Sequence, residues 1–364
     1  MSESARDRPG GVLADIKDAV TVRSALLVIA VLGLGVGFIL SYVGALHQPE
    51  AKDLPFAVVA PAEIQGPVLI GFNSLPGQPL SPRLAADPRT ARAQVADRGT
   101  MGALVVDAAS TTDTLYVASA AGPSISTTIS RIVVAADGQR GRSVRVVDLV
   151  PVSPRDSGGL TSFYMAIGWT VAGYLIASIL GISSGSRPAT FTRATIRLIA
   201  LALCAFAAGI VGTWLVQYIL GALPGPYWPT VAVGTLLVFG AGAVTVLLQI
   251  GFGIVGIGLA VLLFVILGNP SAGGAYARAL IPPFWRAIGA FLPPGAGTDA
   301  TRSIAYFGGQ DTAQPLLILG GYALVGLVGA LLLAVFLRPK GRTPASAAPP
   351  PAPSPPTPPT VSAG

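Results

Sequence analysis

The chain is poor in charged residues: only 11% of its 364 residues are Asp, Glu, Lys or Arg, whereas 52% are hydrophobic. Soluble domains contain about 25% charged residues. The deficit is concentrated, because no Asp, Glu, Lys, Arg or His occurs from Leu198 to Ala277. A charge-free stretch of this length excludes an ordinary soluble fold and indicates helices embedded in a lipid bilayer.

Cysteine, histidine and lysine are scarce, and each scarcity excludes a kind of site. A single cysteine, Cys204, allows no disulfide and no Cys-rich metal site within one chain. Lys17, Lys52 and Lys340 are followed by Asp, Asp and Gly, so the chain has no G-x-x-x-x-G-K-[ST] phosphate loop. The only histidine, His47, stands alone beside an apolar run. The sequence therefore predicts no catalytic residues, no metal, no cofactor and no enzyme activity.

The net charge of +7 would fit a nucleic-acid-binding protein until the charges are located. Much of the excess lies in two acid-free segments beside apolar runs: 183–197, with Arg187, Arg193 and Arg197, and the tail after 337. This is the positive-inside pattern of membrane proteins. It predicts a bilayer and no nucleic acid as partner, with both termini cytoplasmic. The few lysines among the basic residues are typical of a GC-rich bacterial genome, so we expect a bacterial plasma membrane.

Six apolar runs predict about six transmembrane helices, at 24–46, 163–182, 198–221, 231–250, 252–267 and 316–337. A cleaved signal peptide is the alternative for the first run, because VGA at 43–45 resembles a cleavage site. Signal peptides have apolar regions of only about 7–15 residues, so a spanning helix is favoured. Residues 1–23 predict a cytoplasmic amphipathic segment. The Pro-rich residues 338–364 predict a disordered cytoplasmic tail.

Residues 47–162 regain charge and predict a folded extracytoplasmic domain between the first two spans. Short β-rich runs predict strands at 57–61, 66–72, 102–107, 114–120 and 143–151. Helices are predicted at 87–99, with Asp87 as N-cap and Gly99 as the stop, and at 123–137. The predicted fold class is therefore an α-helical polytopic membrane protein with a small α/β domain inserted between helices 1 and 2.

Residues 268–314 are broken by Pro and Gly into apolar pieces too short to cross a bilayer. We expect an outer interfacial or re-entrant segment, with Arg286 and Arg302 reaching lipid headgroups and Trp285 at the interface. Asp299 and Asp311 are interpreted as isolated acids.

Several glycines predict close helix packing rather than a ligand site. Gly33 and Gly37 form a small-xxx-small pair in the first span. The letters GFGIVG at 251–256 fit a dinucleotide-binding pattern but lie in an apolar run, with no βαβ unit around them. Gly251 and Gly253 are therefore expected at the tight turn of a membrane hairpin.

Three features together resemble the type 2 ABC-transporter permease family, in its phage infection protein-like branch: the layout of a first helix, a large external domain and five further helices, and two segments of the sequence. One is the junction 146–169, with Asp148, Pro151, Gly158, Phe163 and Tyr164. The other is 267–309, with its GNP…GG, PPFWR, LPPGAG and R-x-x-x-Y-F stretches. The residues that carry the second match are Asn269, Pro270, Gly273, Gly274, Pro282, Phe284, Pro293, Pro294, Gly295, Arg302, Tyr306 and Phe307.

The resemblance implies the membrane half of a dimeric exporter, as a homodimer or a heterodimer, energised by a separate cytoplasmic ATPase. It implies that this ATPase contacts the N-terminal segment and the 183–197 loop, including Arg187, Arg193 and Arg197. It supplies no catalytic residues. The absence of acidic residues from the spans disfavours a proton-coupled carrier. The alternative is a non-transporting envelope protein whose external domain binds a cell-surface or cell-wall partner.

Overall fold

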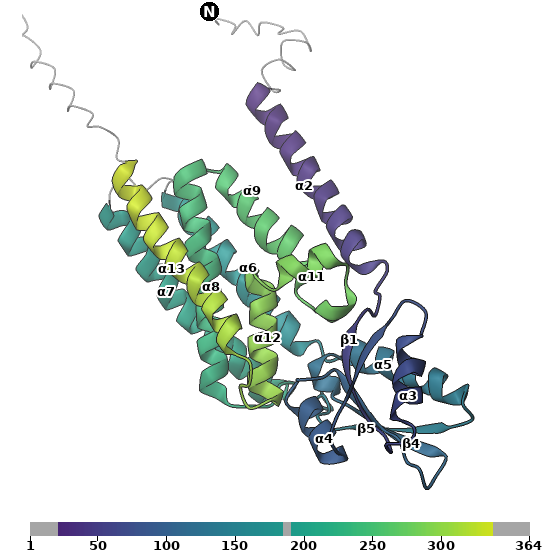
Figure 1. Cartoon of the computed structure of the whole chain (residues 1–364). Coiled ribbons are helices and arrows are strands. Elements are labelled where there is room, and N and C mark those ends of the chain that lie inside the picture. Colours follow the sequence, from purple (N-terminus) through teal and green to yellow (C-terminus); the bar gives the residue numbers. More distant parts are fainter. Residues whose placement is uncertain (1–20, 185–190, 338–364) are drawn as a thin grey trace, which may run out of the picture.

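The computed structural model describes residues 21–184 and 191–337, which form a helical bundle with a small sheet domain at one end (Figure 1). The predicted cytoplasmic N-terminal segment and Pro-rich tail lie outside the described residues, except for residues 21–23. Within the described ranges, five helices are long and apolar enough to cross a membrane. The chain is thus a polytopic helical membrane protein. These helices are α2 (Val22–Leu46), α6 (Thr161–Ser184), α7 (Phe191–Trp214), α8 (Tyr227–Phe252) and α13 (Ala313–Phe336).

Where the sequence predicts a further span at 252–267, the structure has a shorter apolar helix, Val255–Ser271. It consists of α9 (Val255–Val261), a π-helical turn, η3 (Leu262–Leu267), and α10 (Gly268–Ser271). A second π-helical turn, η2 (Leu215–Ile219), extends α7. Figure 1 shows α9 leading back along the bundle toward the sheet domain.

Helix α8 lies at the centre of the bundle and packs against α6, α7 and α13. The close contacts depend on small residues. Trp169 of α6 lies against Gly212 of α7 and Gly234 of α8, and its indole nitrogen donates to the Ala208 carbonyl at 3.2 Å. A Cβ at Gly234 would come within 2.6 Å of the Trp169 ring. Small side chains thus let the helices approach without an apolar driving force between them.

Helix α2 stands apart from the other spans (Figure 1). Only 6% of its span is buried, compared with 67% for α8. It touches the bundle mainly through η3 and α10. There the Asn269 side-chain amide donates to the Tyr42 hydroxyl at 2.7 Å. Most apolar side chains along the rest of α2 are exposed in this chain.

The sheet domain contains five strands in the order β2-β1-β3-β4-β5. Only the β3–β4 pair is antiparallel; the other three pairs are parallel. The strands are β1 (Leu54–Val59), β2 (Leu80–Leu84), β3 (Gly102–Val105), β4 (Thr112–Val117) and β5 (Ser143–Asp148). The helices are α3 (Gln65–Asn73), α4 (Pro88–Ala96), α5 (Pro123–Gly138) and the short η1 (Ser119–Ala121).

Most elements of this domain lie near their predicted positions, with three corrections. The run 66–72, predicted as a strand, is helix α3. The edge strand β2 was not predicted, because LSPRL is polar and contains a proline. Asp87 does cap α4, by accepting the Thr90 N–H at 2.8 Å, but the helix ends before Gly99, and Arg98 takes the positive φ of 61°.

Alternate residues of the strands face two different cores. Phe56 and Val58 join Phe72 of α3 and Ile129 of α5 on one face of the sheet. Alanines such as Ala57 face α4 on the other side, together with Phe307. The period of two along each strand explains this division. The side chains on the α4 face are mostly small, and they leave space for Phe307, which comes from the membrane bundle.

Residues 268–314 contain several short helices, and these helices lie in different surroundings. After η4 (Arg278–Leu280), α11 (Pro283–Gly289) lies near the end of α2, where Trp285 packs beside Gly44. Helix α12 (Pro293–Tyr306) is instead buried among α6, α8 and α13. Gly297 fits between Leu237 and Ala166 there. The interfacial alternative therefore does not fit α12, whose small residues allow deep packing, and the re-entrant alternative for this segment stays a prediction.

Candidate functional site

The end of α12 joins the membrane bundle to the sheet domain. The Tyr306 hydroxyl accepts the Ser153 N–H at 3.3 Å, and the Arg98 guanidinium donates to the Ser303 hydroxyl. Arg98 also lies 5.3 Å from the centre of the Phe307 ring, a cation–π distance. These contacts place α12 against the α4 face of the sheet.

The connection after α10 holds the opposite face of the same sheet. Ala277 and Leu280 are buried in the core formed by α3 and α5. The Ala277 N–H donates to Ser124 Oγ at 3.0 Å, and the Glu50 N–H donates to the Leu280 carbonyl at 2.8 Å. The sheet domain is therefore held on both faces by residues of one segment, 277–307.

Of the residues matched to the permease family in the segment 267–309, Arg302, Tyr306 and Phe307 contact the sheet domain in this joint, and most of the others lie in α10, α11 and the start of α12. Asn269 anchors α2, and Gly273 has a positive φ of 79° at the turn after α10. Gly274 lies against the ring of Phe163 at the start of α6, so the two matched segments touch each other. The remaining matched residues include buried Pro270, the α11 cap Pro282, exposed Phe284, and Pro293, Pro294 and Gly295 at the start of α12.

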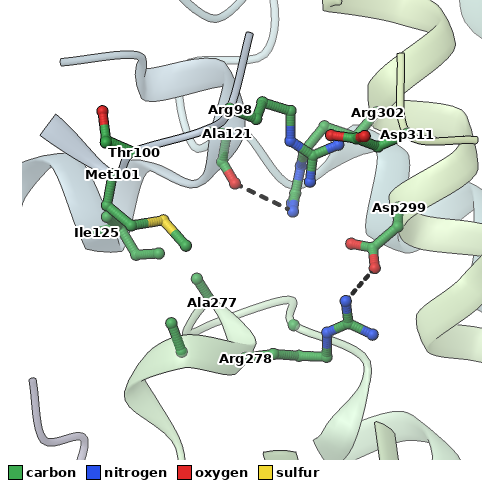
Figure 2. A pocket seen from close by; sticks show the side chains of 12 residues that line it. Arg98, Thr100, Met101, Ala121, Ile125, Ala277, Arg278, Asp299, Arg302 and Asp311 are labelled. Carbon is green, nitrogen blue, oxygen red and sulfur yellow. Dashed lines mark hydrogen bonds and ion pairs between the residues drawn. The ribbon is translucent and has the colours of Figure 1, made fainter. Parts of the chain in front are cut away.

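A pocket of about 180 Å³ lies within the joint, and we take it as the candidate site (Figure 2). Arg98 enters it from the turn before β3, Arg278 from η4 and Arg302 from α12. Asp299 and Asp311 also line it. Because these elements are far apart in the sequence, no local motif predicts the cluster.

The charged groups of the pocket are unequally compensated. Arg278 forms an ion pair with Asp299. The sequence-based expectation that Asp299 is an isolated acid is therefore wrong. Arg302 is only 5% exposed and donates one 3.5 Å hydrogen bond, to the Ala121 carbonyl. Burial lowers the pKa of Arg302 most, Asp299 raises it, and Arg98 and Arg278 lower it. An arginine stays charged even so, and a buried charge is costly unless it is paired.

Arg302 therefore does not extend into lipid from an exposed interfacial helix, as the sequence predicted, because protein encloses its side chain. Helix α12 is packed inside the bundle, and the Arg302 side chain lies among the residues that line the pocket (Figure 2). Arg286, on α11, is partly buried and its NH2 group lies 3.4 Å from the Ile281 carbonyl. The sequence alone does not identify Arg98 or Arg278 as site residues. In the sequence, each is simply an arginine near glycines or prolines.

The predicted cytoplasmic contact residues differ in placement. Arg187 lies outside the described residues. Arg193 is exposed near the start of α7, at the end of the bundle away from the sheet domain. Arg197 is only 6% exposed and lies one turn deeper, beside the buried residues Ala194, Leu198 and Leu201. A surface contact through the Arg197 side chain is thus not available in this chain.

The glycines predicted to pack helices differ in what lies next to them in the structure. Gly253 ends α8 with a positive φ of 63° and forms the hairpin turn to α9. Gly251 faces Leu333 of α13. Gly37 faces Ile266 of η3, whereas nothing lies within 4 Å of a Cβ built on Gly33. The pair in α2 therefore contributes one contact within this chain and leaves one open position.

The described spans are lined mainly by apolar side chains rather than by groups that could bind a metal ion or react. Among residues 21–184 and 191–337, no three His, Cys, Asp or Glu side chains gather where they could hold a metal ion. Three hollows along the spans are lined mainly by apolar side chains, for example Phe206, Trp228 and Leu236 between α7 and α8. Comparison of the chain with family models, curated proteins and solved structures gives no match, so these comparisons identify no family.

Proposed function

We propose that this protein is a permease-like membrane subunit of an ABC-type exporter in a bacterial plasma membrane. In this proposal a separate ATPase supplies the energy, since the chain has no phosphate loop. The observation that carries the proposal is the double attachment of the sheet domain to the segment 277–307. A shift of α12 between α6 and α8 would move the external domain with it, which couples the membrane helices to the outside.

The arrangement of the chain ends supports the same proposal. Helix α2 begins, and α13 ends, at the end of the bundle opposite the sheet domain (Figure 1). Exposed Arg193 lies at that end as well. By the positive-inside rule this end is cytoplasmic and the sheet domain is outside, with the short helix Val255–Ser271 as a sixth crossing. A cytoplasmic ATPase then has access to the 183–197 loop.

A second copy or a related chain is part of the proposal. Two hollows along the spans of the described residues are lined mainly by apolar side chains, so a substrate in them would meet few polar groups of a single copy. Helix α2 leaves most of its surface uncovered. A dimer would place such surfaces around a shared pathway, and a lipid-like or otherwise apolar substrate suits their chemistry.

The test is affinity purification of the full chain from native membranes, with mass spectrometry of the proteins that accompany it. We expect a stoichiometric ATPase that is reduced at least tenfold when Arg187 and Arg193 are both replaced by Ala. Arg145→Ala, an exposed arginine on β5, is the matched control and should retain the ATPase. Absence of any ATPase, together with no nucleotide-dependent transport after reconstitution, would overturn the proposal.

The alternative is a non-transporting envelope protein whose sheet domain binds a cell-surface or cell-wall partner. The apolar lining of the hollows in the described part of the chain favours it, since an ion or a polar solute would meet few polar groups there. Replacing α2 alone with an unrelated spanning helix should then preserve function, because α2 would serve only as an anchor. Loss of function while the sheet domain stays folded would count against this alternative.

A further inference from the structure

The pocket in the joint concentrates positive charge on the outer side of the bundle. Three guanidinium groups, from Arg98, Arg278 and Arg302, face two carboxylates, from Asp299 and Asp311. Asp299 is occupied by Arg278. Within the described part of the chain, no ion pair joins Asp311 to any of these arginines. The pocket thus keeps a net positive charge that its own side chains leave uncompensated.

Arg302 is the least compensated of the three arginines. Arg98 has the Ser303 hydroxyl and the Phe307 ring, and Arg278 has Asp299. Arg302 has five N–H donors, and in the described structure it makes one long hydrogen bond, to Ala121. Figure 2 shows its guanidinium extending between the residues that line the pocket. A buried cation with free donors beside two more cations costs free energy, which an anion would recover.

Aromatic residues of the kind that lie near lipid headgroups are found close to the site. Gly225 packs against Ala305, one turn from Arg302 on α12. Tyr227 and Trp228 come after Gly225 and Pro226, at the start of α8, and such aromatic residues are typical of the water–lipid boundary. Met101, Ile125 and Ala277 form an apolar wall on one side of the pocket. The pocket therefore presents charged donors and an apolar surface near residues typical of the boundary between membrane and water.

We propose that this pocket binds a phosphate group, with Arg302 as the buried donor and Arg98 beside it. Guanidinium groups bind phosphate through paired N–H donors, and planar paired recognition favours arginine over lysine. The group belongs either to the headgroup of a phospholipid or to free phosphate. A bound phosphate would also brace the joint, because its donors come from the sheet domain and from α12. The inference does not depend on an ATPase partner or on transport.

The experiment uses the full chain in non-ionic detergent, free of phosphate and sulfate. Thermal unfolding is followed while sodium phosphate is added at constant ionic strength, with sodium chloride as the control. A second titration uses water-soluble dihexanoyl phosphatidylglycerol, with dihexanoylglycerol as the control that lacks phosphate. We expect a saturable rise in the unfolding midpoint with at least one of the two phosphate ligands and with neither control.

The variants decide whether the pocket is responsible. Arg302→Gln should weaken the apparent affinity at least tenfold, and Arg302→Lys should weaken it less, because it keeps the charge but loses the paired donors. Arg145→Gln, exposed on β5, should leave binding unchanged. If Arg302→Gln does not fold, Arg98→Gln replaces it in the same titration.

Each outcome has a defined meaning. Stabilisation by inorganic phosphate assigns the site to a free anion, and stabilisation by the phospholipid alone assigns it to a headgroup. No saturable shift with either ligand, or a shift that the foldable pocket variant retains, would overturn the proposal. Because none of these measurements requires an ATPase, their failure is distinct from failure of the exporter proposal.

Discussion

Most of the largest fully buried side chains, including Phe56, Phe72 and Leu104, belong to the sheet domain. In the bundle, the helix crossings rest on glycine and alanine, such as Gly234 against Trp169 and Gly326 against Ala243. Burial of large apolar groups stabilises a domain in water. Between helices in lipid that driving force is absent, and close contact takes its place. The same chain is thus stabilised by burial of large apolar side chains in the sheet domain and by close contact of small residues between the helices of the bundle.

The sharpest test of this contrast removes a large side chain from the sheet core. Phe56→Ala should destabilise the sheet domain by about 3–5 kcal/mol, because Phe56 is fully buried and its ring lies 5.8 Å from that of Phe72. Hydrogen exchange of the full chain should show lost protection in the strands and little change in α8. Ile70→Ala, at a position 69% exposed on α3, is the control. Equal loss of protection in the bundle would break the comparison.

The converse change enlarges a small residue in the bundle. A Cβ on Gly326 would lie 2.5 Å from the Val244 nitrogen, so Gly326→Val should separate α13 from α8. We expect a loss of about 1–3 kcal/mol, the usual cost of overpacking. Gly320→Val on the same helix is the matched control, since nothing lies within 4 Å of a Cβ there. Unfolding in detergent should separate the two variants; identical midpoints would contradict the packing rule.

A smaller effect concerns charge buried in the sheet domain. Burial raises the pKa of Asp137 most, Asp113 raises it further, and Arg140 and Arg142 lower it. A folded-state pKa above the unfolded value contributes stability that is complete at low pH and is lost as the pH rises through the folded pKa. Asp137→Asn cannot lose a proton and should therefore gain stability relative to the wild type as the pH rises from about 3 to 7.

The check for this prediction is the unfolding midpoint of the sheet domain in both proteins across that pH range. Glu63→Gln, an exposed acid before α3, is the control for a change of net charge. A difference between wild type and Asp137→Asn that stays constant with pH would show that the Asp137 carboxyl is adequately paired with Arg140, which lies 3.2 Å away.

The errors of sequence-based prediction follow from the same physics. A short apolar run such as 66–72 suits a buried strand and a helix equally well, and its packing against the sheet decided for helix α3. Helix α12 contains Pro, Gly and charged residues, the composition of a loop, yet its small side chains let it enter the bundle. Arg302 was therefore placed at a lipid surface when its surroundings are protein.

The sequence by itself determined the membrane character, the approximate positions of the five long helices, and local signals such as the Asp87 cap. These features depend on residues near one another in the chain, or on composition, which a linear pattern records. Only the tertiary structure decided that α12 is buried, that Arg197 is not a surface residue, and that Arg98 and Ser303 meet. Such contacts join residues far apart in the sequence, and their energy depends on which side chains surround them after folding.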